Sequence, residues 1–553
     1  MRMRAIVLAL CLAVEISAGQ ALPPDARRAM DSISKAELRA HMQFLADDLL
    51  EGRGPGTRGH ELAAKYVAAE FATIGLAPAG DGGTYFQRVP FREITVQPEQ
   101  CSMSLTRNGA TEPLQWGKDF VTRGHELTPD ASFDAPMVFV GYGVVAPEQH
   151  YDDYAGVNAH GKVVVLLAGA PASFPTEERA HWASGREKAR EAAAHGAVGI
   201  VGIFTPESET QLPWARVIIG ARLPQLRWVG PDGMPNDAFP QIKASATLST
   251  AAAERLFQGA PQTWQQVWQA AQSGKLKGFD LPVKAEVHSV SRHREMTSPN
   301  VAGVLRGSDP TRRNEYVIFS AHTDHLGIGT PINGDAIYNG AADDASGVSA
   351  VIAMARAFSR LPQPPARSIL FLAVTAEEKG LLGADYFAHF PTVPHDAMVA
   401  DFNIDGASVF YTFKDVFALG GEHTSLGKVV ARNAALLGLE YTTDPMPEQV
   451  NFIRADHYSF VRQGVPAVTI NEGLKAKDPN VDGRKFVENW IATRYHSPID
   501  DMQQPLNFDA TIQFMQLNFM AGYEVANAAS RPTWVAGDFF GELFGKTHAP
   551  AGK

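Results

Sequence analysis

The sequence predicts an α/β protein with a mixed, mostly parallel sheet sandwiched by helices, into which a β-rich module is inserted. Two continuous apolar runs, Tyr316–Ser320 and Ser368–Val374, are typical of strands that are covered on both faces. Further strands are expected at 398–404 and 465–470. Between the first two runs, apolar residues recur at helical spacing, so strands and helices alternate as in a layered α/β sheet. This apolar stripe consists of Val348, Val351, Ile352, Ala355 and Phe358.

The composition is that of a globular protein. The chain has 553 residues, of which 45% are hydrophobic and 20% charged, so it can form more than one domain and is not disordered. Lys and Arg number 49 against 60 Asp and Glu, a net charge of −11 that gives no reason to expect nucleic-acid binding. Only two cysteines, Cys11 and Cys101, are present, which excludes a disulfide framework.

Residues 1–21 have the features of a secretory signal. Arg2 and Arg4 give a positive start, and the apolar run Ala5–Val14 is too short to span a bilayer. Cleavage is expected after Ala21, with Ala18 as the second option. No other stretch reaches 18 consecutive apolar residues. We therefore expect an exported protein, periplasmic or secreted, without a membrane span.

The remaining chain divides by pattern. From about Ser34 to Gly75 the periodicity is helical, and the glycine-rich stretch 51–59 within it is expected to be a loop. Short β-branched runs follow from about residue 131, and the alternation of strands and helices begins after 265. The expected units are a signal at 1–21, the N-terminal part of the main domain at 30–130, a β-rich insert at 131–265, the core of the main domain at 266–531 and a tail at 532–553.

The insert combines short strands with a helix. Strands are expected at Pro136–Val145, Lys162–Leu167 and Val198–Phe204, and a helix at Glu187–His195. The segments Gly161-Lys-Val-Val-Val-Leu-Leu and Lys188-Ala-Arg-Glu-Ala-Ala-Ala-His-Gly-Ala-Val-Gly-Ile resemble the protease-associated (PA) domain, a small β-rich module that is inserted in several secreted peptidases. The insert has no catalytic set of its own, and it could cover a cleft, bind substrate or mediate association.

Side chains that can bind metals follow the predicted strands, where open α/β sheets build their sites. Alone, each motif has an ordinary structural reading, since acidic residues before a helix commonly cap it. Together, carboxylates that leave one edge of a sheet repel one another unless a cation is present. Oxygen and nitrogen ligands without a thiolate suit zinc in a hydrolytic site. The residues are His322, Asp343, Asp344, Glu377, Glu378, Asp405 and His496.

These motifs come in a specific order along the chain. They are His322-Thr-Asp324, Asp343-Asp-Ala-Ser-Gly347, Glu377-Glu378, Asn403-Ile-Asp405 and Tyr495-His496. The pattern resembles the secreted metallo-aminopeptidases of the M28 family, over about 34–130 and 266–530. The resemblance implies a zinc-peptidase-like fold. One departure is Gly406, where relatives usually carry a larger apolar residue.

The resemblance implies two Zn²⁺ ions that share one carboxylate, that of Asp343. It also implies a cis peptide bond between Asp343 and Asp344. Each ion keeps an open coordination position, as catalysis requires. The implied ligands are His322, Asp343 and Asp405 for one ion, and Asp343, Glu378 and His496 for the other.

The activity that the resemblance implies is removal of N-terminal amino acids from peptides. A water that bridges the two metals would attack the first peptide bond, with Glu377 as the general base. Asp324 has the right spacing to accept the free N–H of His322 and fix its tautomer. The expected partners are peptides with a free N-terminus, and the oligomeric state stays open.

Three other functions remain as alternatives. A carboxypeptidase or dipeptidase on the same fold would grip a C-terminal carboxylate with arginines, and Arg454 and Arg494 are available. A glutaminyl cyclase shares the fold but works with one zinc ion. A non-catalytic receptor would have lost its ligands, and all of them are present here. His325, His457 and the loop 52–59 are weaker site candidates that we leave outside the expected site.

Overall fold

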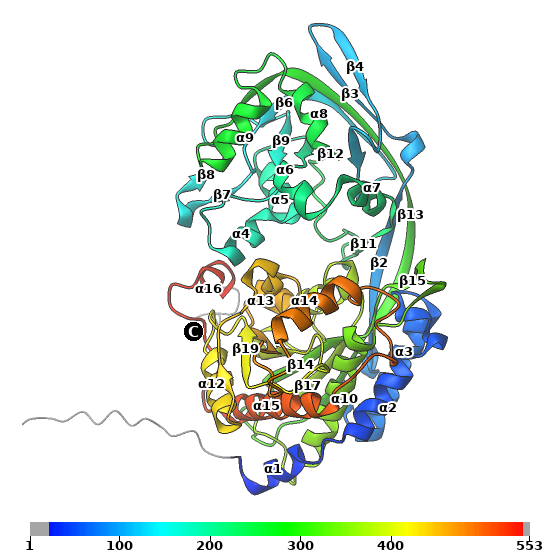
Figure 1. The fold of residues 1–553 in the computed structure, drawn as a ribbon, viewed down its shortest axis with the longest axis vertical. Coiled ribbons are helices and arrows are strands. Elements are labelled where there is room, and N and C mark those ends of the chain that lie inside the picture. The colour runs from blue at the N-terminus through cyan, green and yellow to red at the C-terminus, as the bar shows by residue number, and fades with distance from the viewer. Residues whose placement is uncertain (1–21, 546–553) are drawn as a thin grey trace, which may run out of the picture.

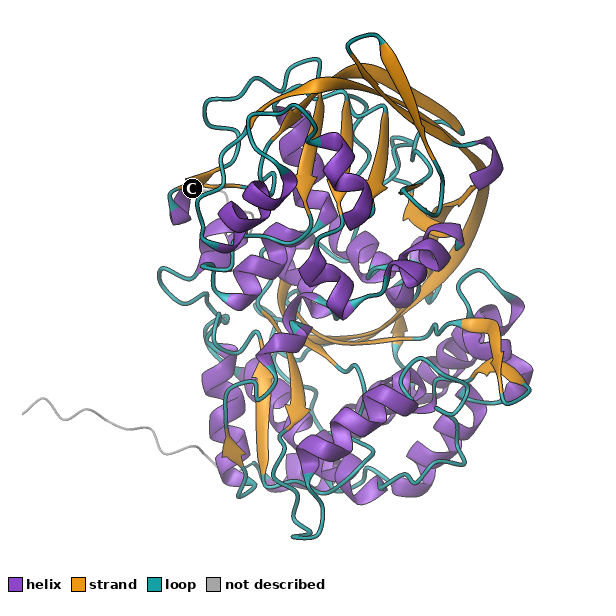
Figure 2. Ribbon diagram, turned by 45° about the horizontal axis from the view of Figure 1, so that its top comes forward, coloured by secondary structure: helices purple, strands orange, loops and turns teal. Residues whose placement is uncertain are grey.

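The computed structural model describes residues 22–545, which form two lobes (Figure 1). The lower lobe has helices packed on a central sheet, and the upper lobe is a second sheet with short helices against it (Figure 2). Two long strands, β2 (Phe86–Val96) and β13 (Phe279–Leu305), pair with each other and connect the lobes. The expected signal at 1–21 lies outside the described residues.

The central sheet of the lower lobe is mixed, as predicted. Its strands lie in the order β11-β2-β13-β17-β14-β18-β21-β19-β20. The four strands from β17 to β21 are parallel to one another, whereas β13 and β19 run antiparallel beside them. The bounds are β1 (Ala77–Pro78), β11 (Gln225–Trp228), β14 (Tyr316–His322), β17 (Ser368–Val374), β18 (Met398–Asn403), β19 (Asp415–Leu419), β20 (Glu440–Tyr441) and β21 (Ala467–Glu472).

Helices cover both faces of this sheet. Val317 and Phe319 of β14 pack into one helical layer, and Ile318 between them faces the other, because side chains alternate along a strand. Helix α10, which contains the predicted apolar stripe, is buried almost all round, since it lies between the sheet and outer helices. One layer contains α2 (Lys35–Leu45), α3 (Arg58–Ile74), α10 (Ser346–Ser359) and α15 (Phe508–Asn527), and the other contains α11 (Leu382–His389) and α13 (His457–Arg462).

Helix α3 shows how local sequence sets an element's ends. Thr57 caps its start by accepting a hydrogen bond from the backbone N–H of His60 at 3.3 Å. Gly75 ends it in the left-handed conformation with φ 88°, as the sequence predicts. The other elements of this lobe are α1 (Pro24–Met30), α12 (Leu426–Leu436), α14 (Gly483–Thr493), α16 (Phe539–Phe544) and the hairpin β15 (Gly327–Ile332) and β16 (Asp335–Tyr338).

The upper lobe has a core of its own. Its sheet runs in the order β4-β3-β13-β6-β9-β10-β12-β5. The predicted strands 162–167 and 198–204 and the helix 187–195 are present, whereas the strand expected at 136–145 begins at Asp130 and ends at Phe139, where the chain turns. The bounds are β3 (Ser102–Arg107), β4 (Ala110–Leu114), β5 (Phe120–Thr122), β6 (Asp130–Phe139), β7 (Val145–Ala146), β8 (Tyr151–Asp152), β9 (Val163–Leu167), β10 (Gly199–Ile203), β12 (Ala244–Leu248), α4 (Thr176–Ala183), α5 (Gly185–Ala194), α6 (Pro206–Gln211), α7 (Trp214–Arg222), α8 (Thr250–Leu256) and α9 (Trp264–Gln272).

This lobe begins earlier and ends later than the expected boundaries at 131 and 265. Strand β3 pairs with β13, and its Met103 and Leu105 enter the upper core beside Phe133. The first half of β13 also belongs to this lobe, because it pairs with β6. The sequence could not show this, since the alternation of a half-buried strand is the same whichever sheet the strand joins.

The described residues can be searched for membrane-spanning helices and for disulfide bonds. None of the helices described between residues 22 and 545 is long and apolar enough to cross a bilayer. Cys101 carries a free thiol in the described chain and contacts the carbonyl oxygens of Gln97 and Val290.

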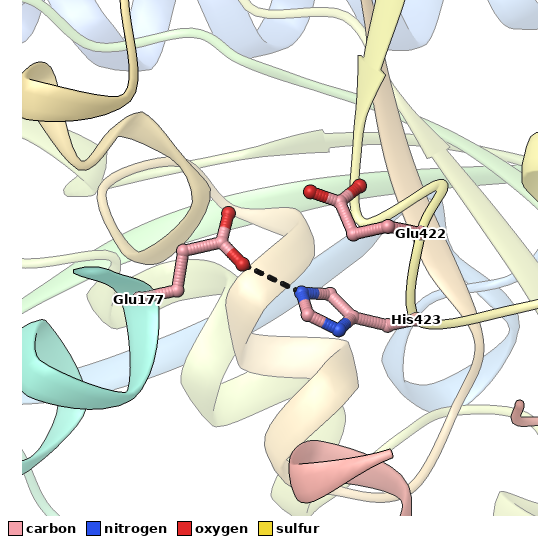
Figure 3. Close-up of side chains that lie close together, drawn as sticks. All are labelled: Glu177, Glu422 and His423. Atoms are coloured by element: carbon pink, nitrogen blue, oxygen red, sulfur yellow. Dashed lines mark hydrogen bonds and ion pairs between the residues drawn. The ribbon is translucent and has the colours of Figure 1, made fainter. Parts of the chain in front are cut away.

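An imidazole flanked by carboxylates joins the two lobes to the C-terminal segment. His423, just before α12, lies with Nε2 2.7 Å from an oxygen of Glu177 on α4 of the upper lobe (Figure 3). Its Nδ1 lies 2.6 Å from Asp538, which caps α16 in the segment expected to be a tail. The carboxylate of Glu422 lies beside this pair (Figure 3). Both ring nitrogens therefore have a carboxylate partner, and ion pairing accounts for this cluster without a metal ion.

The charge on His423 makes this connection depend on pH. Burial lowers the pKa of His423, but the hydrogen bonds to Asp538 and Glu177 outweigh it and raise the pKa to about 10. A histidine whose pKa is raised by folding stabilises the fold fully below its unfolded pKa, and this stabilisation is lost as the pH rises through 10.

We predict that His423→Gln lowers the free energy of unfolding by about 3 kcal/mol at pH 6, because it leaves two partly buried carboxylates without a cation. At pH 10 the difference from the unsubstituted protein should shrink. Urea unfolding at both pH values measures this, with the exposed His160→Gln as control. An equal loss at pH 6 and pH 10 would contradict the ion-pair assignment.

Candidate metal site

The expected metal ligands meet at one edge of the central sheet. β14, β17 and β18 are parallel, so their carboxyl ends lie at the same edge, where α/β sheets form their sites. Side chains from the ends of these strands are joined there by one from the segment before α10 and one from the loop after α14. These residues are His322, Asp343, Glu377, Glu378, Asp405 and His496.

Asp343 lies at the centre of this group. Its Oδ1 is 3.1 Å from Nε2 of His322, and Asp405 Oδ1 is 3.6 Å from the same nitrogen. Its Oδ2 is 3.4 Å from Nε2 of His496, which lies 3.0 Å from Glu378 Oε2. Asp343 thus turns one oxygen towards each of two donor sets, which is how a carboxylate shared by two metal ions is placed.

His325 is an additional member that the sequence analysis left out. Its Nδ1 lies 2.7 Å from Glu378 Oε1 and 3.9 Å from Asp343 Oδ2. Its ring meets that of His496 edge to face, with centroids 5.7 Å apart. The only signal in the sequence was its position three residues after His322, because its approach to Glu378 depends on the turn that follows β14.

Several buried atoms of this group have no hydrogen bond to any other described residue. They include Nε2 of His322, both ring nitrogens of His325 and Oε1 of Glu378. The neighbouring carboxylate oxygens are close enough for ion pairs but not in hydrogen-bonding direction. Buried polar atoms without hydrogen bonds are rare and costly, and a cation satisfies such atoms where they face a common point, as one atom from each of His325, Asp343 and Glu378 does. Imidazole nitrogens and carboxylate oxygens without a thiolate suit zinc, so the residues fit a metal site.

Asp324 is placed differently from the prediction. Its Oδ1 is 4.0 Å from His322 Nδ1, and its main-chain carbonyl oxygen is 3.1 Å from that nitrogen instead. The chain turns after β14, which brings the backbone of Asp324 rather than its carboxylate beside the ring. The carboxylate accepts hydrogen bonds from the backbone N–H groups of Glu377 at 3.1 Å and Glu378 at 3.4 Å. Asp324 therefore holds the turn that carries these two glutamates.

Two further buried aspartates hold the backbone of the ligands. Asp344 accepts from the N–H of His322 at 3.2 Å and from that of Gly406, next to Asp405, at 2.9 Å. Asp500 accepts from the N–H of Asp343 at 3.1 Å. The peptide bond between Asp343 and Asp344 is cis, as the resemblance implies. Each of the ligand-bearing loops is thus tied to the others through a carboxylate.

Arg53 is a residue of this region that sequence reasoning missed. Arg53 is 1% exposed, and its guanidinium donates to the carbonyl oxygens of Thr323 at 2.9 Å, Asn339 at 2.6 Å and Gly340 at 3.0 Å. It therefore joins the turn after His322 to the segment that leads to Asp343. Its positive charge faces the buried aspartates, which partly offset the lowering of the pKa of Arg53 by burial.

The loop that carries Arg53 requires a glycine beside it. Gly52 has φ 66°, and a Cβ on it would lie 2.5 Å from the carbonyl oxygens of Gly327 and Tyr338. Only glycine allows this approach of the loop to the β15–β16 hairpin. The glycine-rich stretch 51–59, expected to be a plain loop, thus positions a buried cation behind the metal site.

Two cavities meet at Glu377. One, of about 320 Å³, is bounded on the metal side by Asp343, Glu377 and Asp405. The other, of about 390 Å³, is lined by Glu377, Glu378 and His496 and, from the upper lobe, by Ser184, Arg186 and Asp237. The site therefore lies in a cleft to which both lobes contribute. Burial raises the pKa of Glu377, an effect to which the nearby Asp405, Asp456 and Glu378 add.

The remaining candidates have structural partners. Tyr495 stacks on His496 with centroids 3.8 Å apart. His457 lies on α13, and its Nδ1 is 2.8 Å from the hydroxyl of Thr469, so it has the role of a structural histidine. Arg454 lines both cavities, whereas Arg494 donates to the carbonyl of Ile499 at 3.3 Å.

We predict that Arg53→Met lowers the free energy of unfolding by about 3–5 kcal/mol, because it leaves buried carbonyl groups and aspartates without their cation. Arg58→Met is the matched control, since Arg58 is exposed and pairs with Glu51 at the surface, where an ion pair contributes about 1 kcal/mol or less. Urea unfolding measures both. Equal effects of the two substitutions would show that Arg53 does not hold the site together.

Comparison with known proteins agrees with this geometry. Residues 300–521 match the family model described as peptidase family M28. Over 229 residues the chain is 28% identical to "Probable leucine aminopeptidase 2" of Aspergillus fumigatus, a match that covers 40% of this chain and 43% of that protein. Over 264 residues it is 25% identical to "Probable zinc metalloprotease" of Pyrenophora tritici-repentis, covering 42% and 58%. The chain thus spans about half the length of these curated relatives.

A solved structure shares the fold of nearly the whole chain. It is an aminopeptidase from Aneurinibacillus sp. strain AM-1, with a TM-score of 0.52 and 18% identity over 92% of this chain and 97% of that one. The predicted ligands, from His322 to His496, all lie inside the segment that the family model matches. Over residues 300–521 the chain is thus similar to peptidase family M28.

Proposed function

We propose that this protein is a zinc-dependent aminopeptidase that removes N-terminal amino acids from peptides. The observation that carries the proposal is the position of Asp343, which directs one oxygen to His322 and Asp405 and the other to Glu378 and His496. Two donor sets around one shared carboxylate are suited to two metal ions. The names of the relatives, an aminopeptidase and a zinc metalloprotease, support the same function.

Two Zn²⁺ ions are the proposed cofactors. His322, Asp343 and Asp405 would hold one, and Asp343, Glu378 and His496 the other. Bound zinc supplies Lewis-acid chemistry, which polarises a peptide carbonyl and lowers the pKa of water. His325 reaches Glu378 and Asp343 within ion-pair distance, so it would orient Glu378 within the second set.

Glu377 is the proposed general base. It borders both cavities, so its carboxylate faces the place where a peptide would pass from one to the other. It would take the proton of the attacking water and give it to the leaving amine. Asp324 would position it, because the Asp324 carboxylate accepts the backbone N–H of Glu377. Asp324 was expected to assist catalysis by fixing the tautomer of His322. We propose instead that it is a positioning residue, which holds the turn of Glu377 and Glu378.

The proposed substrates are peptides with a free N-terminus. The cavity beside Asp343 and Asp405 would receive the N-terminal residue, and the cavity between the lobes would receive the rest of the peptide. The upper lobe, a PA-like module by its sequence, would then contact the peptide beyond the scissile bond. We propose an exported enzyme, periplasmic or secreted, on the signal features of residues 1–21.

The proposal is tested with amino-acyl p-nitroanilides, each with and without an N-acetyl group, before and after chelation and return of zinc. We expect cleavage of free-amine substrates only, lost with chelator and restored by zinc. If a protein that binds two zinc ions cleaved none of these substrates, the result would contradict the aminopeptidase function. It would favour a carboxypeptidase or dipeptidase, for which Arg454 lies at both cavities.

Glu377→Gln should retain bound zinc and lose about 10²–10⁴-fold in kcat, because the general base is removed while the ligands stay in place. Asp405→Asn is the contrasting variant and should lower the zinc content, since it weakens one donor set. Zinc per chain, measured by elemental analysis, and kcat are compared in the same preparations. Full activity of a zinc-replete Glu377→Gln protein would overturn the role of Glu377.

A further inference from the structure

The cavity beside Asp343 and Asp405 has mostly apolar walls. They come from the loop after β18, from the loop between β20 and α13, from the segment after β21 and from α14. A volume of about 320 Å³ leaves room for a long side chain. The apolar wall residues are Val409, Phe410, Met446, Leu474, Trp490 and Ile491.

Two carboxylates line this cavity away from the expected metal ligands, those of Asp444 and Glu472, and the carboxylate of Asp444 accepts the backbone N–H of Met446 at 2.8 Å. Glu472 ends β21, which runs parallel to β18 with Thr469 opposite Asn403. Neighbouring strands are about 4.8 Å apart. Glu472 therefore lies at the same sheet edge as Asp405, which follows the neighbouring strand β18, and both line this cavity.

Glu472 has no cationic partner among residues 22–545. The hydroxyl of Ser408 donates to its Oε2, and no other side chain hydrogen-bonds or ion-pairs with it in the described part of the chain. Burial raises the pKa of Glu472. Arg454 borders the same cavity but forms no ion pair with Glu472. Glu472 is half-buried, and a carboxylate partly removed from water without a nearby cation is unfavourable, so a ligand that brings a positive charge would be stabilised there.

Gly406 leaves the space between Asp405 and this part of the cavity open. It lines the same cavity, and a Cβ built on it would meet no atom within 4 Å. Its φ of 80° is a conformation that glycine adopts at no steric cost. No side chain of residue 406 therefore separates the expected metal ligands from the apolar walls and Glu472.

We propose that Glu472 makes this cavity a pocket for a cationic N-terminal side chain, that of lysine or arginine. The proposal rests on the aminopeptidase function given above. Lys and Arg commonly bury their methylene groups against apolar surface while the charged end stays in a polar environment. Here the apolar walls would pack against these methylene groups, and Glu472 would pair with the charged end.

The ammonium group that pairs with Glu472 could also be the α-amine of the substrate. Norleucine separates the two sources, because it has the shape of lysine without the terminal charge and keeps the α-amine. If Glu472 bound the α-amine, the substitution Glu472→Gln would lower kcat/KM for lysine and norleucine substrates alike. If it binds the side chain, only the lysine substrate is affected.

The experiment measures kcat/KM for lysyl and norleucyl p-nitroanilides with the zinc-loaded protein and with Glu472→Gln. We expect the unsubstituted protein to prefer lysine, and Glu472→Gln to reduce the ratio of lysine to norleucine about 10–100-fold, the usual effect of losing a hydrogen bond to a charged group. Cleavage of the norleucyl substrate shows that the variant is folded and active.

Glu440→Gln is the matched control, since Glu440 on β20 pairs with Lys475 at the surface and does not line the cavity. It removes the same charge and should leave the ratio unchanged. A preference of the unsubstituted protein for norleucine, or an equal loss on both substrates in Glu472→Gln, would overturn the proposal. No cleavage of either substrate by the unsubstituted protein would instead refute the aminopeptidase function itself.

Discussion

The structure depends on the compensation of negative charge that is buried at one edge of the central sheet. Asp324, Asp344 and Asp500 are each buried and accept backbone N–H groups of the residues that carry the expected ligands. Arg53 supplies a buried positive charge behind them and binds the carbonyl groups of two of the same loops. The ligands in front of them still lack a counter-charge, which explains why this edge of the sheet fits metal ions so well.

The two lobes serve this site in different ways. The lower lobe holds the ligands on parallel strand ends, where the positions of the side chains are set by the pairing of the strands. The upper lobe is attached through β2 and β13 and through the pairing of His423 with Glu177, and it lines the cavity beside Glu377 and Glu378. Residues of the upper lobe thus line part of the cleft.

Glu377 lies beside the cavity that we propose selects the N-terminal side chain of the substrate. It borders both a cavity with apolar walls and a cavity shared by both lobes, and under the proposed function a bound peptide would place its scissile bond beside it. Glu472 gives the first cavity a charge of its own, one strand away from the expected metal ligands. Under the two proposals, a metal ligand, Asp405, and the residue that selects the N-terminal side chain, Glu472, would follow from neighbouring strands of one sheet, β18 and β21.

The sequence by itself determined the α/β layering and the main strands and helices, because these depend on local periodicity. Residue types at the strand ends indicated a group of candidate metal ligands, and the set of five was implied only by the resemblance to a known family. Only the tertiary structure decided the extent of the upper lobe, the place of the Asp324 carboxylate, and the roles of Arg53, His325 and Glu472. Each of these depends on contacts between segments far apart in the chain or on the direction of a turn. Local sequence pattern carries no information about such contacts, since the same strand or loop can meet different partners in different folds.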